Sequence, residues 1–488
     1  MNDTGITPQL HKKLNPFNVW AVAFGCIIGW GAFINPGKKF LPTSGVAGTA
    51  TAMLLGAVIM IIIAFCYAYM VPRYPKAGGE FHFTRTCFGN HFGFLCGWFL
   101  IAAYLTNVPM NSTAIGLIVD GLFGPVLKFG FHYSIAGFDV YLPEILLASG
   151  VLLLFGLMNI RGVKVAGFVQ TFLASGLILS VITLTAAALL TSHASVENLS
   201  PLWGFDKAAA VADFKLGAYV SSDAYAHDTP NAVLVSVLST LAIAPWAFVG
   251  FDTIPQAAEE FRFSYRKVIG IMILAILFGC FVYIANNTIT AAALQSWPDL
   301  IVNSEGTPWL LLTAAEKLLG PAGKVLVGLA VSCAVLSGIM GFYMASSRLM
   351  YSMAQNGFLP AVFAYVHPRF GTPVKAILFC MLISLAGPLL GREALGWFLD
   401  MSSIGASIGF GFTCMATLKT MKRDGDQSPF LKAMAVLGTM FSFTFIILQL
   451  VPIPGLEGVH FCSESYLLLI VWVLLGCVFY FARLQRRL

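Results

Sequence analysis

The chain has 488 residues, of which 58% are hydrophobic and 10% are charged, and its formal net charge is +6. Its mean hydropathy is +0.83. So few polar side chains cannot cover a soluble globule of this length, which excludes a soluble globular protein. An all-α integral membrane protein is predicted, because the apolar stretches have the length that a helix needs to cross a bilayer.

Twelve apolar stretches are long enough to cross a bilayer as helices, which requires about 20 residues each. In chain order they are predicted at 17–36, 45–71, 90–119, 141–159, 166–191, 232–257, 268–292, 324–350, 373–390, 394–418, 431–452 and 465–484. Residues 1–16 are polar and lack the apolar core of a removable signal peptide, so a short N-terminal tail is expected. The longest connections, 191–230 and 294–322, are polar and are expected to be surface loops with short helices of their own.

The distribution of Lys and Arg predicts the orientation. Counted on alternate sides of these spans, 20 of the 28 Lys and Arg fall on the side that holds both termini. The positive-inside rule places that side in the cytoplasm, so a multi-pass protein of the cell membrane with both termini inside is expected. The net charge thus reflects topology, and no nucleic-acid partner is predicted.

The cysteines and histidines give no sign of a metal, redox or catalytic site. Eight of the 10 cysteines lie inside predicted spans, where they act as small apolar residues. The sequence holds no CxxC pair, no HExxH and no group of His and carboxylates at ligand spacing, so neither a metal nor another cofactor is expected. A membrane-embedded enzyme would be a different class, but no Ser-His-Asp arrangement or pair of acids is predicted at a common membrane depth.

Two of the predicted spans are interrupted by glycine. One interruption is Gly25-Cys26-Ile27-Ile28-Gly29-Trp30-Gly31, and the other, five spans later, is Phe248-Val249-Gly250-Phe251-Asp252. Glycine costs roughly 1 kcal/mol against alanine in a helix, and an unpaired peptide group in a bilayer costs more, so such breaks persist where the freed backbone faces a cavity. Free N–H groups attract anions and free carbonyls attract cations, so the two breaks predict a binding site for a small charged solute, as in a transport protein.

Several motifs resemble those of the amino acid-polyamine-organocation (APC) transporter superfamily. The stretch Gly25–Phe33 resembles its first-helix signature, and four further stretches agree with the family in order and spacing. These are 74–80, 159–164, 250–260, and 346–360 followed by 367–373. The resemblance implies a core at 17–418 built from two inverted repeats of five spans each, 17–191 and 232–418, with broken helices 1 and 6. Residues 419–488 then hold spans 11 and 12 and the C-terminal tail.

The two breaks define the expected substrate site. The N–H groups of Gly29, Trp30 and Gly31 are expected to meet a substrate carboxylate, because they begin the second half of a broken helix. Carbonyl groups from both breaks are expected to face the substrate amine, namely those of Ile27, Ile28, Ala247, Phe248 and Gly250. Trp246 and Trp30 are also candidates for lining the pocket.

Three acidic or aromatic positions are candidates for gating. Phe251 lies beside the second break and is the expected gate. Glu259 and Glu260 lie where span 6 meets the cytoplasm, where a gate ion pair with a cytoplasmic-side cation is one interpretation and a solvated helix end is the other. Asp252 either contacts substrate or shapes the break, and Asp400 is the second notable acid inside a span, expected near its outer end.

The coupling ion is left open between H⁺ and Na⁺. Many members of the family that the chain resembles carry a lysine seven residues after the glutamine of a Val-Gln pair, but Val169-Gln170 is followed at that spacing by Leu177. A proton relay on such a lysine is therefore not expected. A sodium site would draw on span 1 carbonyls near Gly25 and Ile28 and on hydroxyls such as those of Ser332 and Ser337, because hard cations prefer oxygen ligands.

These observations favour a secondary transporter that carries amino acids by alternating access. One alternative is a transporter of amines, such as ethanolamine or a polyamine; a polyamine would need several carboxylates around the cavity, and only Asp252 and Asp400 are obvious. Another alternative is a channel or a nutrient sensor on a transporter frame that does not carry its ligand. The expected partners are a small-molecule substrate and membrane lipid, and the oligomeric state is open.

Overall fold

The structure is a computed structural model, which describes residues 10, 12–135, 137–219, 221–303, 309–392, 394–454, 456 and 459–485. Within these residues, nine helical stretches are long and apolar enough to cross a membrane. They are formed by α2 (Gly31–Asn35), η1 (Pro36–Phe40) and α3 (Leu41–Met70) together, α5 (Asn90–Phe123), α6 (Leu142–Ile160), α7 (Val163–Leu190), α11 (Val268–Ala293), α14 (Pro321–Gln355), α17 (Ala394–Asp424), α18 (Pro429–Leu450) and α19 (Ser463–Gln485). The prediction of an all-α membrane protein is confirmed.

Three shorter apolar helical stretches lie where the remaining spans are predicted. They are α1 (Pro16–Ile27), α9 (Pro230–Leu241), and α15 (Val374–Ser384) continued by α16 (Ala386–Leu390). The first and sixth are short because the glycine segments interrupt their predicted spans, whereas the ninth covers Val374–Leu390 with a turn at Leu385.

The remaining elements are short. The connections hold α4 (Gly79–Phe88), η2 (Val196–Leu199), α8 (Lys207–Lys215), η3 (Ser222–Tyr225), α10 (Ala244–Phe248), η4 (Phe251–Thr253), η5 (Pro255–Glu260), η6 (Tyr265–Lys267), α12 (Trp297–Val302), α13 (Leu310–Leu319) and η7 (Ala361–Ala364). One hairpin, β1 (His132–Ile135) with β2 (Phe138–Tyr141), pairs antiparallel from His132 with Tyr141 to Ile135 with Phe138. The short helices expected in the two long loops are present.

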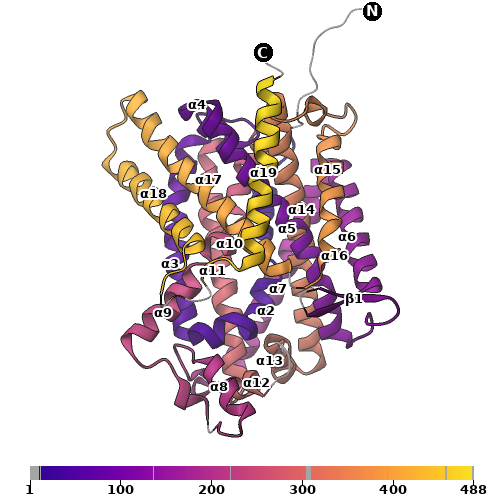
Figure 1. The fold of residues 1–488 in the computed structure, drawn as a ribbon, viewed down its shortest axis with the longest axis vertical. Helices are drawn as coiled ribbons and strands as arrows, with labels where there is room; N and C mark the ends of the chain where they lie inside the picture. Colours follow the sequence, from indigo (N-terminus) through magenta and orange to yellow (C-terminus); the bar gives the residue numbers. More distant parts are fainter. Residues whose placement is uncertain are drawn as a thin grey trace, which may run out of the picture.

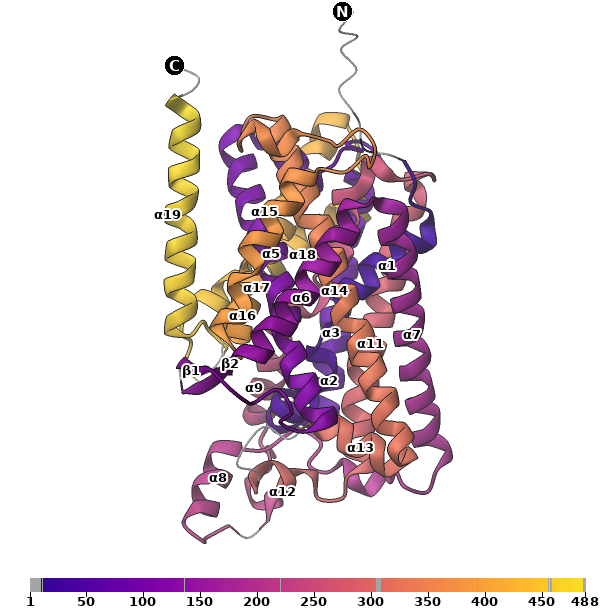
Figure 2. The ribbon, with the colours of Figure 1, turned by 90° about the vertical axis from the view of Figure 1, so that its right-hand side faces the viewer.

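The long helices run side by side along the long axis of the molecule (Figure 1). The helix α4 and the last turns of α19 lie at one end, and α8 and α12 lie at the other. In their most apolar stretches, 83% of α5 and 78% of α17 are buried but only 11% of α19, which stands beside the bundle (Figure 2). Large apolar side chains such as those of Phe168, Phe172 and Leu189 are exposed, which is unusual on a soluble protein and suits a surface that faces lipid.

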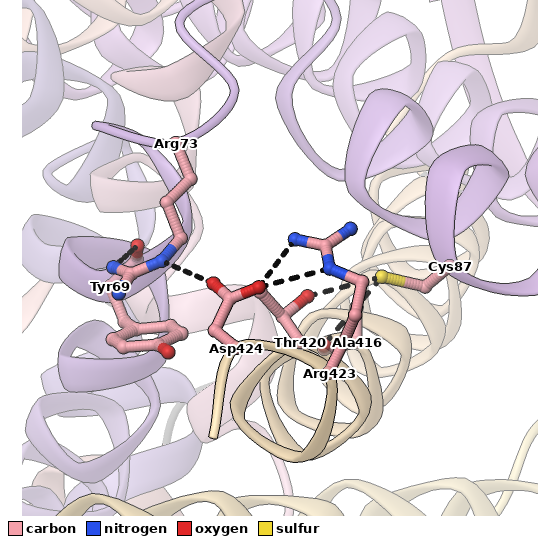
Figure 3. Close-up of polar contacts among 7 residues, drawn as sticks. All are labelled: Tyr69, Arg73, Cys87, Ala416, Thr420, Arg423 and Asp424. Atoms are coloured by element: carbon pink, nitrogen blue, oxygen red, sulfur yellow. Dashed lines mark hydrogen bonds and ion pairs between the residues drawn. The ribbon is translucent and has the colours of Figure 1, made fainter. Parts of the chain in front are cut away.

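Polar contacts join segments that are far apart in the chain at the end where α4 lies (Figure 3). Arg73 Nε, just after α3, lies 3.2 Å from Asp424 Oδ2 at the end of α17, and Arg73 also donates to the Tyr69 carbonyl at 3.0 Å. Arg423 Nη2 lies 2.9 Å from the other Asp424 carboxylate oxygen. Because these groups are partly exposed, each pair contributes at most about 1 kcal/mol, so the contacts align the helix ends more than they stabilise them.

Candidate functional site

The interruption expected in the first span is present. α1 ends at Ile27, Ile28 is extended with φ −98° and ψ 101°, and the helix resumes at Gly31. The Ile28 N–H closes the last turn of α1 by donating to the Phe24 carbonyl at 3.0 Å. The N–H groups of Gly29, Trp30 and Gly31 donate to no acceptor within the described part of the chain. Three neighbouring donors are therefore left for a ligand.

The interruption expected in the sixth span is also present, and it is longer than the first. α9 ends at Leu241, the short α10 ends at Phe248, and the chain turns at Gly250, which has φ 146° and ψ −44°. Among the described residues, no group donates to the Ala247 or Phe248 carbonyl, as the amine site requires. The Gly250 carbonyl differs from the expectation, as described next.

The Gly250 carbonyl is already occupied in this conformation. It accepts the Thr253 N–H at 3.1 Å and the Thr253 hydroxyl at 2.6 Å. A carbonyl oxygen has two lone pairs, so both are used and none remains for a substrate amine. The Ile27 carbonyl accepts the Tyr283 hydroxyl at 3.2 Å and keeps one lone pair. The prediction that Gly250 supplies a carbonyl to the amine site is therefore corrected: this residue shapes the turn.

The two interruptions pack directly against each other. A Cβ on Gly250 would lie 2.6 Å from the Ile27 nitrogen and 2.7 Å from the Ala23 oxygen, so only glycine permits this approach. A Cβ on Gly31 would overlap the Trp246 ring, whose centroid lies 6.2 Å from that of Trp30. The free N–H groups of the first break and the free carbonyls of the second break thus lie around one candidate site in the bundle.

Asn111 of α5 also borders this place, and sequence reasoning missed it. A Cβ on Gly29 would lie 3.0 Å from Asn111 Oδ1. Asn111 Nδ2 donates to the Asn107 carbonyl at 2.8 Å, whereas Oδ1 is buried and has no partner among the described residues. A buried acceptor without a donor is costly, and a substrate amine would satisfy it. The available signal was a pair of asparagines four residues apart in one apolar span.

Phe251, the expected gate, is completely buried. Its ring stacks on Phe410 with centroids 5.4 Å apart and meets the Tyr67 ring edge to face at 5.6 Å. This aromatic cluster fills the space next to the second break, and a gate role for Phe251 stays a prediction.

Asp252 is fully buried and holds the break in shape. Its Oδ1 accepts the Gly250 N–H at 2.7 Å, and its Oδ2 accepts the Tyr104 hydroxyl at 3.0 Å. Of the two roles considered for this carboxylate, the geometry favours shaping the break over contacting substrate.

An ion pair at the end of span 6 involves Glu260, one of the two acids considered there. Arg348 Nε lies 2.9 Å from Glu260 Oε1, and both side chains are buried. Glu259, the other gate candidate at this place, is only half-buried and forms no ion pair within the described residues. The Glu260 carbonyl also accepts the N–H groups of Lys13 and Leu14, each at 3.0 Å, while the Arg262 N–H donates to the Leu14 carbonyl at 3.0 Å. The segment before α1 is thereby joined to the segment after η5.

A cavity of about 470 Å³ reaches the first break from the opposite end of the bundle. Trp30 lines it, together with Lys39 of η1, Asp400 of α17 and His460. Asp400 accepts the Ser465 hydroxyl at 2.6 Å. The cavity therefore carries charged groups of both signs on its wall, and one of the two candidate pocket tryptophans lines it.

The groups considered for a sodium site are only partly brought together. Ser337 lies against Gly25, where a Cβ would overlap its hydroxyl, and it accepts Gln170 Nε2 at 2.6 Å. Ser332 is half-buried on the same helix, five residues earlier. No group of three or more His, Cys, Asp or Glu that could hold a metal occurs in the described residues. A sodium site at Gly25, Ile28, Ser332 and Ser337 stays a prediction.

Comparison with known proteins gives a consistent picture. A sequence model of the family described as amino acid permease matches residues 14–479. The chain is 24% identical to the vacuolar cationic amino acid transporter 4 of Arabidopsis thaliana over 439 residues, which cover 86% of this chain and 65% of the relative. It is 23% identical to the methylthioribose transporter of Bacillus subtilis (strain 168), covering 97% and 93%.

A third relative is the large neutral amino acids transporter small subunit 2 of Homo sapiens. It is 26% identical over 381 residues, which cover 77% of this chain and 64% of the relative. The matches thus span less than two thirds of the length of the Arabidopsis and human proteins, but nearly all of the Bacillus protein.

Proposed function

The chain belongs to the amino acid permease family, and from this premise we propose that it is a secondary transporter that moves amino acids across the cell membrane by alternating access. Its family and its relatives are transporters rather than enzymes. The proposed architecture has twelve spans, with the nine long helical stretches joined by the three shorter ones, and two inverted repeats of five spans in which the first and sixth are broken. Both termini lie in the cytoplasm in this proposal.

The single observation that carries the proposed substrate class is the pairing of free donors with free acceptors at the two breaks. The N–H groups of Gly29, Trp30 and Gly31 suit a carboxylate, and the carbonyls of Ala247 and Phe248 suit an ammonium group. An α-amino acid carries both groups on one carbon and so satisfies both sets at once. Among the residues described, these sets have no protein partner that a substrate would need to displace.

A second candidate is a substrate without a carboxylate. The observation that favours it is the Bacillus relative, which matches over nearly the full length of both chains and is a methylthioribose transporter. An amine such as ethanolamine belongs to the same candidate class, because it too would leave the first-break donors unused. In either case, the free N–H groups of Gly29, Trp30 and Gly31 would have to be satisfied by water or by a substrate hydroxyl.

Counterflow in liposomes tests the proposal. Purified protein is reconstituted, and the exchange of labelled amino acids is compared with that of their decarboxylated amines and of methylthioribose. Saturable amino acid counterflow that the matching amine does not inhibit is expected. Exchange of amines or methylthioribose alone would favour the second candidate, and binding without any flux would indicate a sensor.

The variant Gly29→Val tests the place of the site. A Cβ at Gly29 already meets Asn111 Oδ1 at 3.0 Å, and a branched side chain adds two more carbons there. Uptake is expected to be lost while the protein still inserts in the membrane. Gly150→Val on α6 is the matched control, because a Cβ at Gly150 meets nothing within 4 Å. Wild-type uptake by Gly29→Val would contradict the site.

A further inference from the structure

Two fully buried carboxylates share one hydrogen-bonded cluster beside the second break. Glu80 lies in the first turn of α4 and Asp252 in η4, and neither side chain is exposed. The hydroxyl of Tyr104 lies 3.4 Å from Glu80 Oε1 and 3.0 Å from Asp252 Oδ2. Tyr67 donates to Glu80 Oε1 at 2.7 Å, and Gln256 Nε2 donates to Glu80 Oε2.

No counter-charge pairs with the cluster in the described part of the chain. Of the seven ion pairs found among the described residues, none includes Glu80 or Asp252. Two ionised carboxylates that share a bridging hydroxyl in a buried place repel each other, and each also loses its hydration. The arrangement is therefore stable with one proton bound to the pair, as is usual for carboxylates that share a site.

The hydrogen bonds of the cluster can accommodate a bound proton. The Tyr104 hydroxyl has one hydrogen, so it can donate to only one of the two carboxylates that it touches. Gln256 is completely buried, and its Oε1 is an acceptor without a donor among the described residues. Turning the Gln256 amide end over would place that oxygen against Glu80, where it accepts the O–H of a carboxylic acid. The glutamine thus suits the ionised acid in one orientation and the protonated acid in the other.

The groups around Glu80 agree with this interpretation. The titratable groups that face it are Tyr67 from α3, Tyr104 and Cys96 from α5, and Asp252 from η4. None of them is a cation. Burial, and then the Asp252 carboxylate, raise the pKa of Glu80 above its ordinary value.

The cluster is also connected to the break. Asp252 follows Phe251 in the chain and holds the Gly250 N–H at 2.7 Å, so a change at this carboxylate acts on the turn itself. Tyr67 donates to Glu80 with its hydroxyl and touches the Phe251 ring with its own ring. Movement of the aromatic gate therefore changes the hydrogen bonding of Glu80.

We propose that Glu80, paired with Asp252 through Tyr104, is a proton-binding site that couples proton movement to substrate transport. This inference rests on the proposed function. In the conformation seen here, one proton is held on the pair as a carboxylic acid. When the Arg348–Glu260 end of the bundle opens, water reaches the pair, the ionised form is stabilised, and the proton leaves as hydronium to that side.

The first experiment requires no substrate. Infrared spectra of the full-length protein in lipid nanodiscs are recorded from pH 5 to pH 9 for the wild type and for Glu80→Gln. The wild type is expected to show the carbonyl band of a protonated carboxylic acid at neutral pH, and Glu80→Gln is expected to lose it. Glu197→Gln, which changes an exposed acid in η2, is the matched control and keeps the band. A wild-type spectrum without such a band at neutral pH would overturn the proposal, as would a band that Glu80→Gln leaves unchanged.

Tyr104→Phe is a second variant for the same infrared measurement, and it replaces Glu80→Gln if that variant does not fold. Removal of the bridging hydroxyl is expected to shift the frequency and the titration midpoint of the acid band. An identical band in Tyr104→Phe would overturn the assignment to this cluster.

The second experiment measures coupling in liposomes with labelled L-leucine and L-lysine as probes, with the membrane potential clamped. Counterflow at equal pH tests the proposed function, and accumulation under a pH gradient tests the proton site. With one proton per substrate, each pH unit supports about tenfold accumulation, because one pH unit corresponds to a tenfold change in an equilibrium constant. Wild-type counterflow without any pH-driven accumulation would overturn coupling and leave the transporter assignment standing. If neither probe is carried, the proposed function fails for these amino acids while the infrared result still decides the proton site.

Discussion

The contact between the two broken spans can be tested by replacing Gly250 with alanine. At φ 146° and ψ −44°, the backbone of this residue lies in a region that side chains with a Cβ rarely adopt. The added Cβ would lie 2.6 Å from the Ile27 nitrogen and 2.7 Å from the Ala23 oxygen. Both are backbone atoms, which cannot rotate out of the way as the end of a flexible side chain can.

The expected magnitude follows from these two effects. Backbone strain of this kind costs about 1–3 kcal/mol, and overpacking costs about 1–3 kcal/mol more, so destabilisation on the order of 2–6 kcal/mol is expected. Gly150→Ala is the matched control, since no atom of the described residues lies within 4 Å of its Cβ and the residue is exposed on α6. There, alanine is expected to be neutral or to stabilise the helix by up to about 1 kcal/mol.

The assay is thermal unfolding of the purified protein in one detergent without ligand, at a fixed heating rate because unfolding of such proteins is often irreversible. Gly250→Ala is expected to unfold at a clearly lower temperature than the wild type, whereas Gly150→Ala unfolds at the same temperature or above it. An unfolding temperature for Gly250→Ala equal to that of the wild type would refute the close approach of the two breaks.

Three further predictions concern single side chains. Phe251→Leu is expected to alter substrate range or affinity at a smaller cost than the about 3–5 kcal/mol expected for Phe251→Ala, and unchanged uptake kinetics would remove the gate. Burial, and then the charges of Lys76 and Arg85, lower the pKa of His82 to about 4. The unfolded chain therefore binds a proton at His82 more readily than the folded chain, and the free energy of unfolding should fall by roughly 3 kcal/mol as the pH drops from about 6.5 to about 4. His82→Gln should flatten that part of the stability profile, and a wild-type profile that is already flat would count against it. Asp400→Asn, on the wall of the cavity of about 470 Å³, is expected to weaken uptake of labelled L-lysine more than that of L-leucine, and an equal loss of both would contradict a charge effect.

The parts of the fold that the sequence predicts are those governed by strong energetic constraints. A run of about 20 apolar residues has few alternatives to a membrane helix, and three glycines between Gly25 and Gly31 make a continuous helix costly. The break at Gly250 was predicted for the same reason. The sequence predicts one span at 373–390, and it gives no sign that this span is divided into α15 and α16 at Leu385.

The details of the site depend on directions that a sequence does not encode. Glu259 and Glu260 are adjacent on a tight 3₁₀ turn, and the turn alone decides which of them faces Arg348. The Gly250 carbonyl is occupied because Thr253 folds back onto it. Asn111 lies in an apolar span, where a side-chain amide usually forms hydrogen bonds within its own helix. Its oxygen becomes a candidate substrate contact only because the first break lies next to it in the structure.

The backbone pairing between the residues before α1 and those after η5 has a consequence for how the protein opens. The Glu260 carbonyl accepts the N–H groups of Lys13 and Leu14 at 3.0 Å, and the Arg262 N–H donates to the Leu14 carbonyl at the same distance. Amides held in one small ladder lose their protection together, in one cooperative opening. In hydrogen exchange, the amides of Lys13, Leu14 and Arg262 are therefore expected to share one protection factor, and unequal protection factors would show that the two chain segments separate independently.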